Sequence, residues 1–182
     1  GGGVFNRGKL TMSYAIVSSN VISDTSSNNG GAGVYSTGTL TMTDSIVSNN
    51  MSTNGGGGIT NTGLATIEHT AIISNTAQRG GGIDTYFDVN ATVVLTVTNT
   101  TISGNTGSSF GGGIASGLSE VRLTNVTIGG NTSNKGAAIA ASSSTVRLLN
   151  TILASSTPAS NCDLDDAFVS LGHNLENGSF CG

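Results

Sequence analysis

The sequence predicts an all-β fold, a right-handed parallel β-helix of about six coils with three short strands each, followed by a C-terminal cap. Three observations lead to this prediction. Gly, Ser, Thr and Asn make up just over half of the 182 residues, whereas only 9% are charged and 4% aromatic. A glycine-rich segment recurs at spacings of 24 to 31 residues, and an eleven-residue segment behind it recurs six times without a gap. Such repeats are typical of a solenoid, in which each unit packs on its neighbours.

The first strand of each coil follows the recurring glycines. An aliphatic residue begins it in every copy, at Val4, Val34, Ile59, Ile83, Ile114 and Ile139. An aliphatic residue directly behind a glycine-rich turn favours a short strand. A repeat of about 25 residues fits one β-helix coil, because a propeller blade needs about 40 to 50 residues and leucine-rich repeats contain more leucine.

The second and third strands lie in the eleven-residue segment. The second alternates apolar and polar residues, as in Leu40-Thr41-Met42-Thr43, so Leu40 and Met42 are expected to point inward and the threonines outward. A residue prone to left-handed backbone conformation then turns the chain, and a third strand such as Thr101-Ile102-Ser103 follows. We expect one apolar core from the stacked first residues of the six copies, Leu10, Leu40, Ala65, Leu95, Val121 and Val146.

Two columns of polar residues are predicted at the turns. Stacked coils are about 4.8 Å apart, so each residue meets its own equivalents above and below. Repeated charges would repel one another there, whereas repeated asparagines hydrogen-bond along the stack. One column is a structural ladder of Asn20, Asn50, Asn75, Asn105 and Asn131, with Ser156 as its sixth member. The second column becomes a regular asparagine ladder in its last three members and consists of Tyr14, Asp44, His69, Asn99, Asn125 and Asn150.

The chain divides into β-helix repeats over residues 1–156 and a C-terminal cap over residues 157–182. Since an uncapped end exposes strand edges, the cap is expected to cover the core with its apolar residues Phe168, Leu171, Leu175 and Phe180. The two cysteines of the cap, Cys162 and Cys181, predict a disulfide, with two buried free thiols as the alternative. A disulfide fits an oxidising, extracellular location. The chain opens inside a repeat, so we expect a processed product or a fragment of a longer protein.

Charge and hydropathy argue against several kinds of partner. The net charge is −4, and the six Lys and Arg residues are scattered, so nucleic-acid binding is not expected. No apolar run approaches the length of a transmembrane segment. The two cysteines and two histidines lack the spacing of a zinc site, and we expect neither a metal nor another cofactor.

The repeats carry a resemblance to known proteins. A Gly-Gly-Gly-Ile element, as at 80–83, followed by an aliphatic-x-x-Asn element, as at 102–105, resembles the polymorphic-outer-membrane-protein type of repeat. The chain is more similar to secreted bacterial parallel β-helix surface proteins of the choice-of-anchor Q type. Those end in a coil like 150–154, a cysteine, a Ser-Leu-Gly-x-Asn-Leu stretch (here 170–175) and a final cysteine. The resemblance covers nearly the whole chain and implies a secreted or cell-surface protein with adhesive or structural roles.

The function expected from the sequence is therefore that of a non-enzymatic extracellular structural or adhesin-like protein. Such a cell-surface scaffold is a rigid rod that needs no special site. Its expected partners are copies of itself, other cell-surface proteins or carbohydrate.

A polysaccharide-binding or polysaccharide-cleaving β-helix, with an architecture like that of pectate lyases, is the alternative. Cleavage needs paired carboxylates, or a base with a cation. The candidate catalytic residues are Asp44, Glu68 and His69 on adjacent coils, with Glu68 expected to point away from His69. Asp84 and Asp88 lie in the next coil, beside an insertion that would form a wall. The competing interpretation of these residues is a surface ion pair in the turn column.

Ice binding is a third alternative, because flat Thr-x-Thr ladders on a β-helix can match an ice lattice. The outward pairs Thr41/Thr43 and Thr96/Thr98 fit this pattern, whereas Arg147/Leu149 does not. Threonine is also a common strand residue, so its abundance has a simpler explanation.

Overall fold

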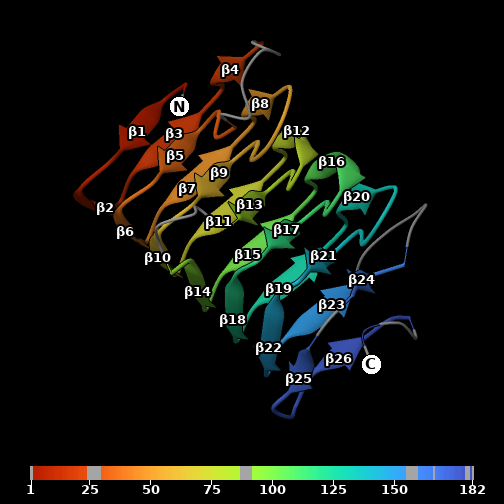
Figure 1. The fold of residues 1–182 in the computed structure, drawn as a ribbon. Helices are drawn as coiled ribbons and strands as arrows, with labels where there is room; N and C mark the ends of the chain where they lie inside the picture. Colours follow the sequence, from red (N-terminus) through yellow and green to blue (C-terminus); the bar gives the residue numbers. More distant parts are fainter. Residues whose placement is uncertain are drawn as a thin grey trace.

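The computed structural model of the protein describes residues 2–23, 30–86, 92–154, 160–165, 167–178 and 181. These residues form strands and turns and contain no helix. All pairings between neighbouring strands are parallel, and the coils stack in chain order from the N-terminal to the C-terminal end of the molecule (Figure 1). The predicted parallel β-helix of about six coils is confirmed, and its arrangement is consistent with right-handed winding.

Three sheets run the length of the solenoid, and each takes one strand from every coil. Sheet A consists of β1 (Val4–Asn6), β5 (Val34–Ser36), β9 (Ile59–Asn61), β13 (Ile83–Tyr86), β17 (Ile114–Gly117), β21 (Ile139–Ser142) and β24 (Cys162–Leu164). Sheet B consists of β2 (Lys9–Ser13), β6 (Thr39–Thr43), β10 (Leu64–Glu68), β14 (Val94–Thr98), β18 (Glu120–Thr124), β22 (Thr145–Leu149) and β25 (Phe168–Ser170). Sheet C consists of β3 (Ile16–Ser18), β7 (Ile46–Ser48), β11 (Ala71–Ile73), β15 (Thr101–Ser103), β19 (Thr127–Gly129), β23 (Ile152–Ala154) and β26 (Leu175–Glu176).

A fourth sheet adds one more short strand to five of the coils. Sheet D consists of β4 (Val21–Ile22), β8 (Met51–Ser52), β12 (Thr76–Arg79), β16 (Thr106–Phe110) and β20 (Thr132–Ser133), which follow one another along one side of the solenoid in Figure 1. Three of these strands, β4, β8 and β20, have only two residues each, and β16 and β20 consist largely of threonine, serine and glycine. Their composition is that of a turn, so the sequence pattern predicted three strands per coil and missed this one.

Equivalent residues of successive coils lie in register. In sheet B the six predicted core positions pair in one column, from Leu10 through Leu40 and Ala65 to Val146. Leu40 and Met42 are fully buried, whereas Thr41 and Thr43, which alternate with them, are only half-buried on the outer face. The buried side chains form a single apolar cluster that extends through all coils.

A left-handed turn connects sheet B to sheet C in each coil. The second predicted column occupies this turn, and its residues have φ between 47° and 56°: Tyr14, Asp44, His69, Asn99, Asn125 and Asn150. Asn and Asp tolerate this conformation better than most other non-glycine residues. The last asparagines also bond along the column, because Asn150 Nδ2 donates to Asn125 Oδ1 at 2.6 Å and Asn125 Nδ2 donates to Asn99 Oδ1 at 2.9 Å.

The other column is a buried ladder of side-chain hydrogen bonds. Asn50 Nδ2 donates to Asn75 Oδ1 at 2.9 Å, and Asn75 Nδ2 donates to Asn105 Oδ1 at 3.0 Å. Each Oδ1 also accepts a bond from the backbone N–H of the previous ladder residue, and each buried Nδ2 donates to a strand carbonyl, as Asn75 does to Val47 at 3.0 Å. The ladder runs from Asn20 to Asn131, and Ser156 lies outside the described residues.

The segment expected to form a cap continues the sheets. Its strands β24, β25 and β26 pair with the last full coil in sheets A, B and C. The predicted disulfide between Cys162 and Cys181 is confirmed, and both cysteines are buried. Phe168 packs on the core, but Leu171 and Leu175 are exposed, so the expectation that these two cover the core is wrong. Phe180 lies outside the described residues. Leu175 pairs in register with Ile152, an outward position of sheet C.

The buried ladder makes a clear prediction about stability. Asn75→Ala should lower the free energy of unfolding by about 3 kcal/mol or more, because it leaves the Asn50 N–H and the Val47 carbonyl without partners in the interior. Asn134→Ala is the control, since its Nδ2 makes one exposed bond to the Ser108 carbonyl and its loss should cost less than about 1 kcal/mol. Urea unfolding measures the free energy of unfolding of both variants. Equal losses in the two variants would contradict a major contribution of the buried ladder to stability.

Strand β15 tests which residues point into the core. Ile102 is fully buried between Ile72 and Ile128, so Ile102→Asp places an unpaired charge in the interior and should cost more than about 4 kcal/mol. The neighbouring Thr101 is exposed, and Thr101→Asp should cost about 1 kcal/mol or less. Thermal unfolding followed by circular dichroism compares the two variants, and a parent-like melting curve for Ile102→Asp would overturn the assignment of the core.

Candidate functional site

A groove runs along the outer face of sheet A. The second residue of each strand points away from the core, and in register these residues are Phe5, Tyr35, Thr60, Asp84, Ala115, Ala140 and Asp163. Several of them are nevertheless buried, since residues of sheet D and its following turn line the same face. Two cavities of about 370 and 350 Å³ lie along this face, and Arg79 lines both of them.

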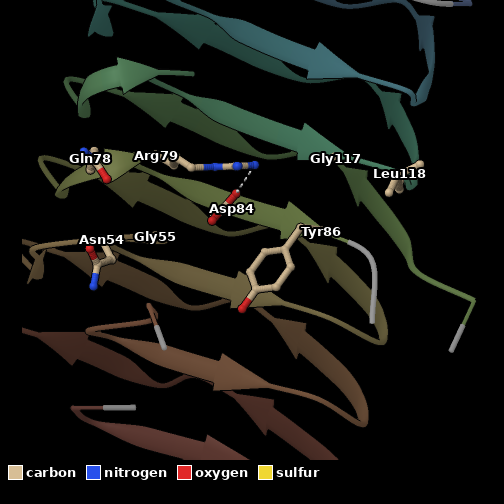
Figure 2. A pocket seen from close by; sticks show the side chains of 8 residues that line it. All are labelled: Asn54, Gly55, Gln78, Arg79, Asp84, Tyr86, Gly117 and Leu118. Atoms are coloured by element: carbon tan, nitrogen blue, oxygen red, sulfur yellow. Dashed lines mark ion pairs between the residues drawn. The ribbon is translucent and has the colours of Figure 1, made fainter. Parts of the chain in front are cut away.

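Three successive coils form the first cavity, which is shown in Figure 2. Asp84 and Tyr86 of β13 lie at its centre, and the Arg79 side chain extends from the end of β12 toward Asp84. The remaining lining residues come from the turn before β9, from β12, and from the end of β17: Asn54, Gly55, Gln78, Gly117 and Leu118. We call this cavity the Arg79–Asp84 pocket.

The pocket contains a buried carboxylate beside a guanidinium group. Arg79 Nη2 lies 3.6 Å from Asp84 Oδ1, which is longer than a hydrogen bond, so the contact is electrostatic. The Asp84 side chain is 3% exposed and that of Arg79 is 43% exposed. Among the described residues, neither Asp84 Oδ1 nor Arg79 Nε has a hydrogen-bond partner, although both atoms are buried. Buried polar atoms normally have such partners, and their absence is a feature of ligand sites as well as of strained cores.

Glycine at position 55 makes room for this carboxylate. A Cβ atom added to Gly55 would overlap Asp84 Oδ2. Gly117 lies on the other side, where an added Cβ would be 3.5 Å from Arg79 Nη2, an ordinary contact distance. The acid therefore occupies space that only glycine in the neighbouring coil leaves open.

Burial changes the acidity of the pocket. Desolvation raises the pKa of Asp84 from 3.8 to about 6, and the positive charge of Arg79 offsets only part of this rise. Burial, and then the neighbouring Tyr35, raise the pKa of Tyr86 above its usual value. At neutral pH the pocket thus holds an ionised Asp84 beside Arg79 and a neutral tyrosine.

Aromatic side chains extend from the pocket toward the N-terminal coils. The rings of Phe5 and Tyr35 stack with centroids 5.3 Å apart and an interplanar angle of 19°. Arg7 lies over the Phe5 ring at 4.9 Å. Tyr86 is close enough to Tyr35 for that residue to raise the pKa of its hydroxyl, and its ring points toward the N-terminal coils in Figure 2. We call Phe5, Tyr35 and Tyr86 the aromatic strip.

The second cavity continues the groove toward the C-terminal coils. Ala115 and Ala140 form its floor, and their small side chains leave the space open. Phe110 lies on one side, with Lys135 Nζ 5.3 Å from its ring centroid. Asp163 and Asp165 line the cavity from the coil that contains β24.

The residues proposed from the sequence as catalytic candidates lie on a different face. Asp44 and His69 occupy the left-handed turn between sheets B and C, one coil apart. Glu68 Oε1 is 3.8 Å from His69 Nδ1, and His69 Nε2 is 3.2 Å from Asn99 Nδ2. The expectation that Glu68 points away from His69 is wrong, because strand alternation ends where His69 adopts φ of 47°. Glu68 and His69 are about half exposed and form a surface ion pair when the imidazole is protonated.

The sequence did not indicate Arg79 as a partner of Asp84. The two residues are five positions apart, but a glycine turn lies between them, so no strand or helix spacing relates them. The alignment of the repeats did contain one indication of this site. In the outward column of sheet A from Tyr35 to Ala140, Asp84 is the only charged residue. Asp88 lies outside the described residues.

Neither a metal site nor a membrane-spanning helix is found in the described ranges. No three His, Cys, Asp or Glu side chains there gather closely enough to hold a metal ion. The same ranges contain no helical segment with the length and hydrophobicity of a membrane span.

Comparisons with protein-family models, with curated proteins and with solved structures give no match. The structure itself defines the class, a parallel β-helix protein. The resemblance to surface proteins of the choice-of-anchor Q type stays a prediction.

The raised pKa of Asp84 predicts an unusual dependence of stability on pH. The folded state binds the proton of this carboxyl more tightly than the unfolded state, so the stabilising contribution is present below pH 3.8 and is lost as the pH rises through about 6. From pH 4 to 7.5 this group should lower the free energy of unfolding by about 2 kcal/mol. Urea unfolding of the parent and of Asp84→Asn across this range isolates the effect. An unchanged pH dependence in the variant would contradict it.

Proposed function

We propose that this chain is a non-enzymatic, structural or adhesin-like segment of a secreted or cell-surface β-helix protein. The observation that carries the proposal is the unbroken stacking of coils, in which three parallel sheets and a buried asparagine ladder connect each coil to the next. A repetitive rod of this kind suits a protein that holds a binding surface at a fixed distance from the cell to which it is attached.

The direction of the hydrogen bonds gives the rod its stiffness. In a parallel β-helix the bonds between strands run along the solenoid axis, because each strand pairs with its equivalent in the next coil. Bending the rod would lengthen bonds in one sheet and compress them in another. The buried ladder adds side-chain bonds in the same direction, as between Asn75 and Asn105.

The chemistry of the chain fits an extracellular setting. Disulfides persist in oxidising compartments, and the Cys162–Cys181 disulfide links β24 to the C-terminal segment. Charged residues are few, and where two like charges stack, at Arg122 and Arg147, the Glu120 carboxylate accepts hydrogen bonds from both. Partners consistent with this role are copies of the same chain and other cell-surface proteins.

The register also bears on the ice-binding alternative. In one outward column of sheet B, Arg122 and Arg147 follow four stacked threonines: Thr11, Thr41, Thr66 and Thr96. In the neighbouring column Glu68 separates Thr43 from Thr98. A flat threonine array of this size is short and interrupted, so the scaffold role is the better supported of the two.

An adhesion assay tests the scaffold proposal against the enzymatic alternative. Beads coated with the protein should be retained on a layer of the same protein or on immobilised surface glycoproteins, and His69→Ala beads should be retained equally. Incubation with soluble plant and bacterial polysaccharides should release no new reducing ends and no unsaturated products absorbing in the ultraviolet. Product release by the parent that His69→Ala or Asp44→Asn abolishes would replace the scaffold role with catalysis.

A further inference from the structure

Beyond the scaffold role, we propose that the groove on sheet A binds a neutral polysaccharide chain, anchored in the Arg79–Asp84 pocket and packed along the aromatic strip. The chain would run parallel to the solenoid axis, because the two cavities and the aromatic rings follow one another along that axis. No cleavage is part of this proposal.

The buried ion pair supplies the anchoring chemistry. A sugar hydroxyl is both a donor and an acceptor, so one hydroxyl can donate to Asp84 and accept from Arg79. Asp84 Oδ1 and Arg79 Nε have no hydrogen-bond partner among the described residues, and the 3.6 Å separation of the pair leaves each group incompletely satisfied. The half-exposed Arg79 side chain covers the carboxylate, so a small displacement of Arg79 opens it to a ligand. Satisfying a buried carboxylate in this way is favourable, since an unpaired one is costly.

Amide groups extend this polar lining. Asn54 and Gln78 lie on the opposite side of the pocket from Leu118 (Figure 2), and each amide presents both a donor and an acceptor. Neighbouring hydroxyls of one sugar ring need such alternating partners. The pocket therefore offers several polar contacts around one sugar residue.

The aromatic strip supplies the apolar contacts. One face of a pyranose ring presents C–H groups, which pack on an aromatic ring and remove apolar surface from water. Tyr86 lies beside Asp84 in the pocket and contributes its ring to the lining (Figure 2). The Phe5 and Tyr35 rings stack on each other, with Arg7 over Phe5, so they continue the apolar surface toward the first coil through their outer edges. Phe110 lines the cavity on the other side of Arg79. Rings spread over several coils fit a polymer better than a single sugar.

The charges of the groove favour a neutral polymer. Asp84 and Arg79 balance each other in the first cavity. In the second, Asp163 and Asp165 face one lysine, Lys135, and the shared Arg79. An acidic polysaccharide would meet these carboxylates, whereas a chain of uncharged hydroxyls would not be repelled.

An extended peptide fits the floor of the groove less well. Peptides that bind to sheets usually pair with the free edge of a strand. Strands β9, β13, β17 and β21 are each paired on both sides, so they offer no free backbone donors or acceptors. Recognition here must use side chains, as sugar recognition does.

Tyrosine fluorescence gives a direct binding assay. The chain has no tryptophan and three tyrosines, of which Tyr35 and Tyr86 belong to the aromatic strip. The probes are hexasaccharides of glucose, mannose, xylose and N-acetylglucosamine, with a galacturonate hexasaccharide as the acidic comparison. At least one neutral probe should change the fluorescence saturably, and the acidic probe should bind at least about tenfold more weakly.

Variants locate the binding site, and calorimetric titration measures their affinities for the same probe. Arg79→Gln, Tyr86→Ala and Gly55→Ala should each weaken binding by about tenfold or more, the last because its methyl group displaces the Asp84 carboxylate. Tyr86→Phe should keep most of the affinity because the ring remains. The controls are Tyr14→Phe, on another face, and Gly8→Ala, whose added Cβ has no heavy atom within 4 Å. Melting temperatures of all variants identify any that fail to fold.

Three outcomes would overturn the proposal: no neutral hexasaccharide binds, the galacturonate binds best, or folded pocket variants bind as tightly as Gly8→Ala. None of these results would affect bead retention on a layer of the protein itself, so the scaffold role is judged separately.

Discussion

Successive coils of this solenoid lie in register, so each side chain has its own equivalents as neighbours above and below, and this constraint determines which residues the chain can use. Aliphatic residues satisfy it by forming one continuous core. Among polar residues, asparagine satisfies it best inside the protein, since its amide donates to one neighbour and accepts from the other, as Asn75 does. The turn between sheets B and C adds a second requirement, a left-handed backbone, which asparagine also tolerates.

The candidate site arises where one column departs from this regularity. On the outer face of sheet A an acid, Asp84, lies between Thr60 and Ala115, which cannot neutralise it. Its compensation comes from another sheet, through Arg79 at the end of β12. Because the neighbouring positions are small, at Gly55, Ala115 and Ala140, the groove stays open around the charged pair. In a repetitive fold, a candidate site can therefore be recognised where a residue differs in charge or size from the equivalent residues of the neighbouring coils.

Much of the fold could be predicted from the sequence because each sequence repeat corresponds to one coil, stacked on the coil before it. The inward positions such as Leu40 and the Cys162–Cys181 pairing required only local patterns. Sheet D was missed because its strands have turn-like compositions, and the exposure of Leu171 and Leu175 was missed because apolar character does not specify the side of a strand. The Arg79–Asp84 contact depends on how a glycine turn folds one sheet against another, which no one-dimensional spacing encodes.

The groove and the rod share one axis, and this has a consequence for how such a molecule changes in length. Inserting or deleting a whole coil preserves every contact type of the stack, because a coil contacts only its two neighbours. Such an insertion or deletion also lengthens or shortens the groove on sheet A by one coil, which is about 4.8 Å. The length of the rod and the length of the groove are thus set together by the number of coils, whereas the Arg79–Asp84 pair, which lies at one position along the stack, stays single.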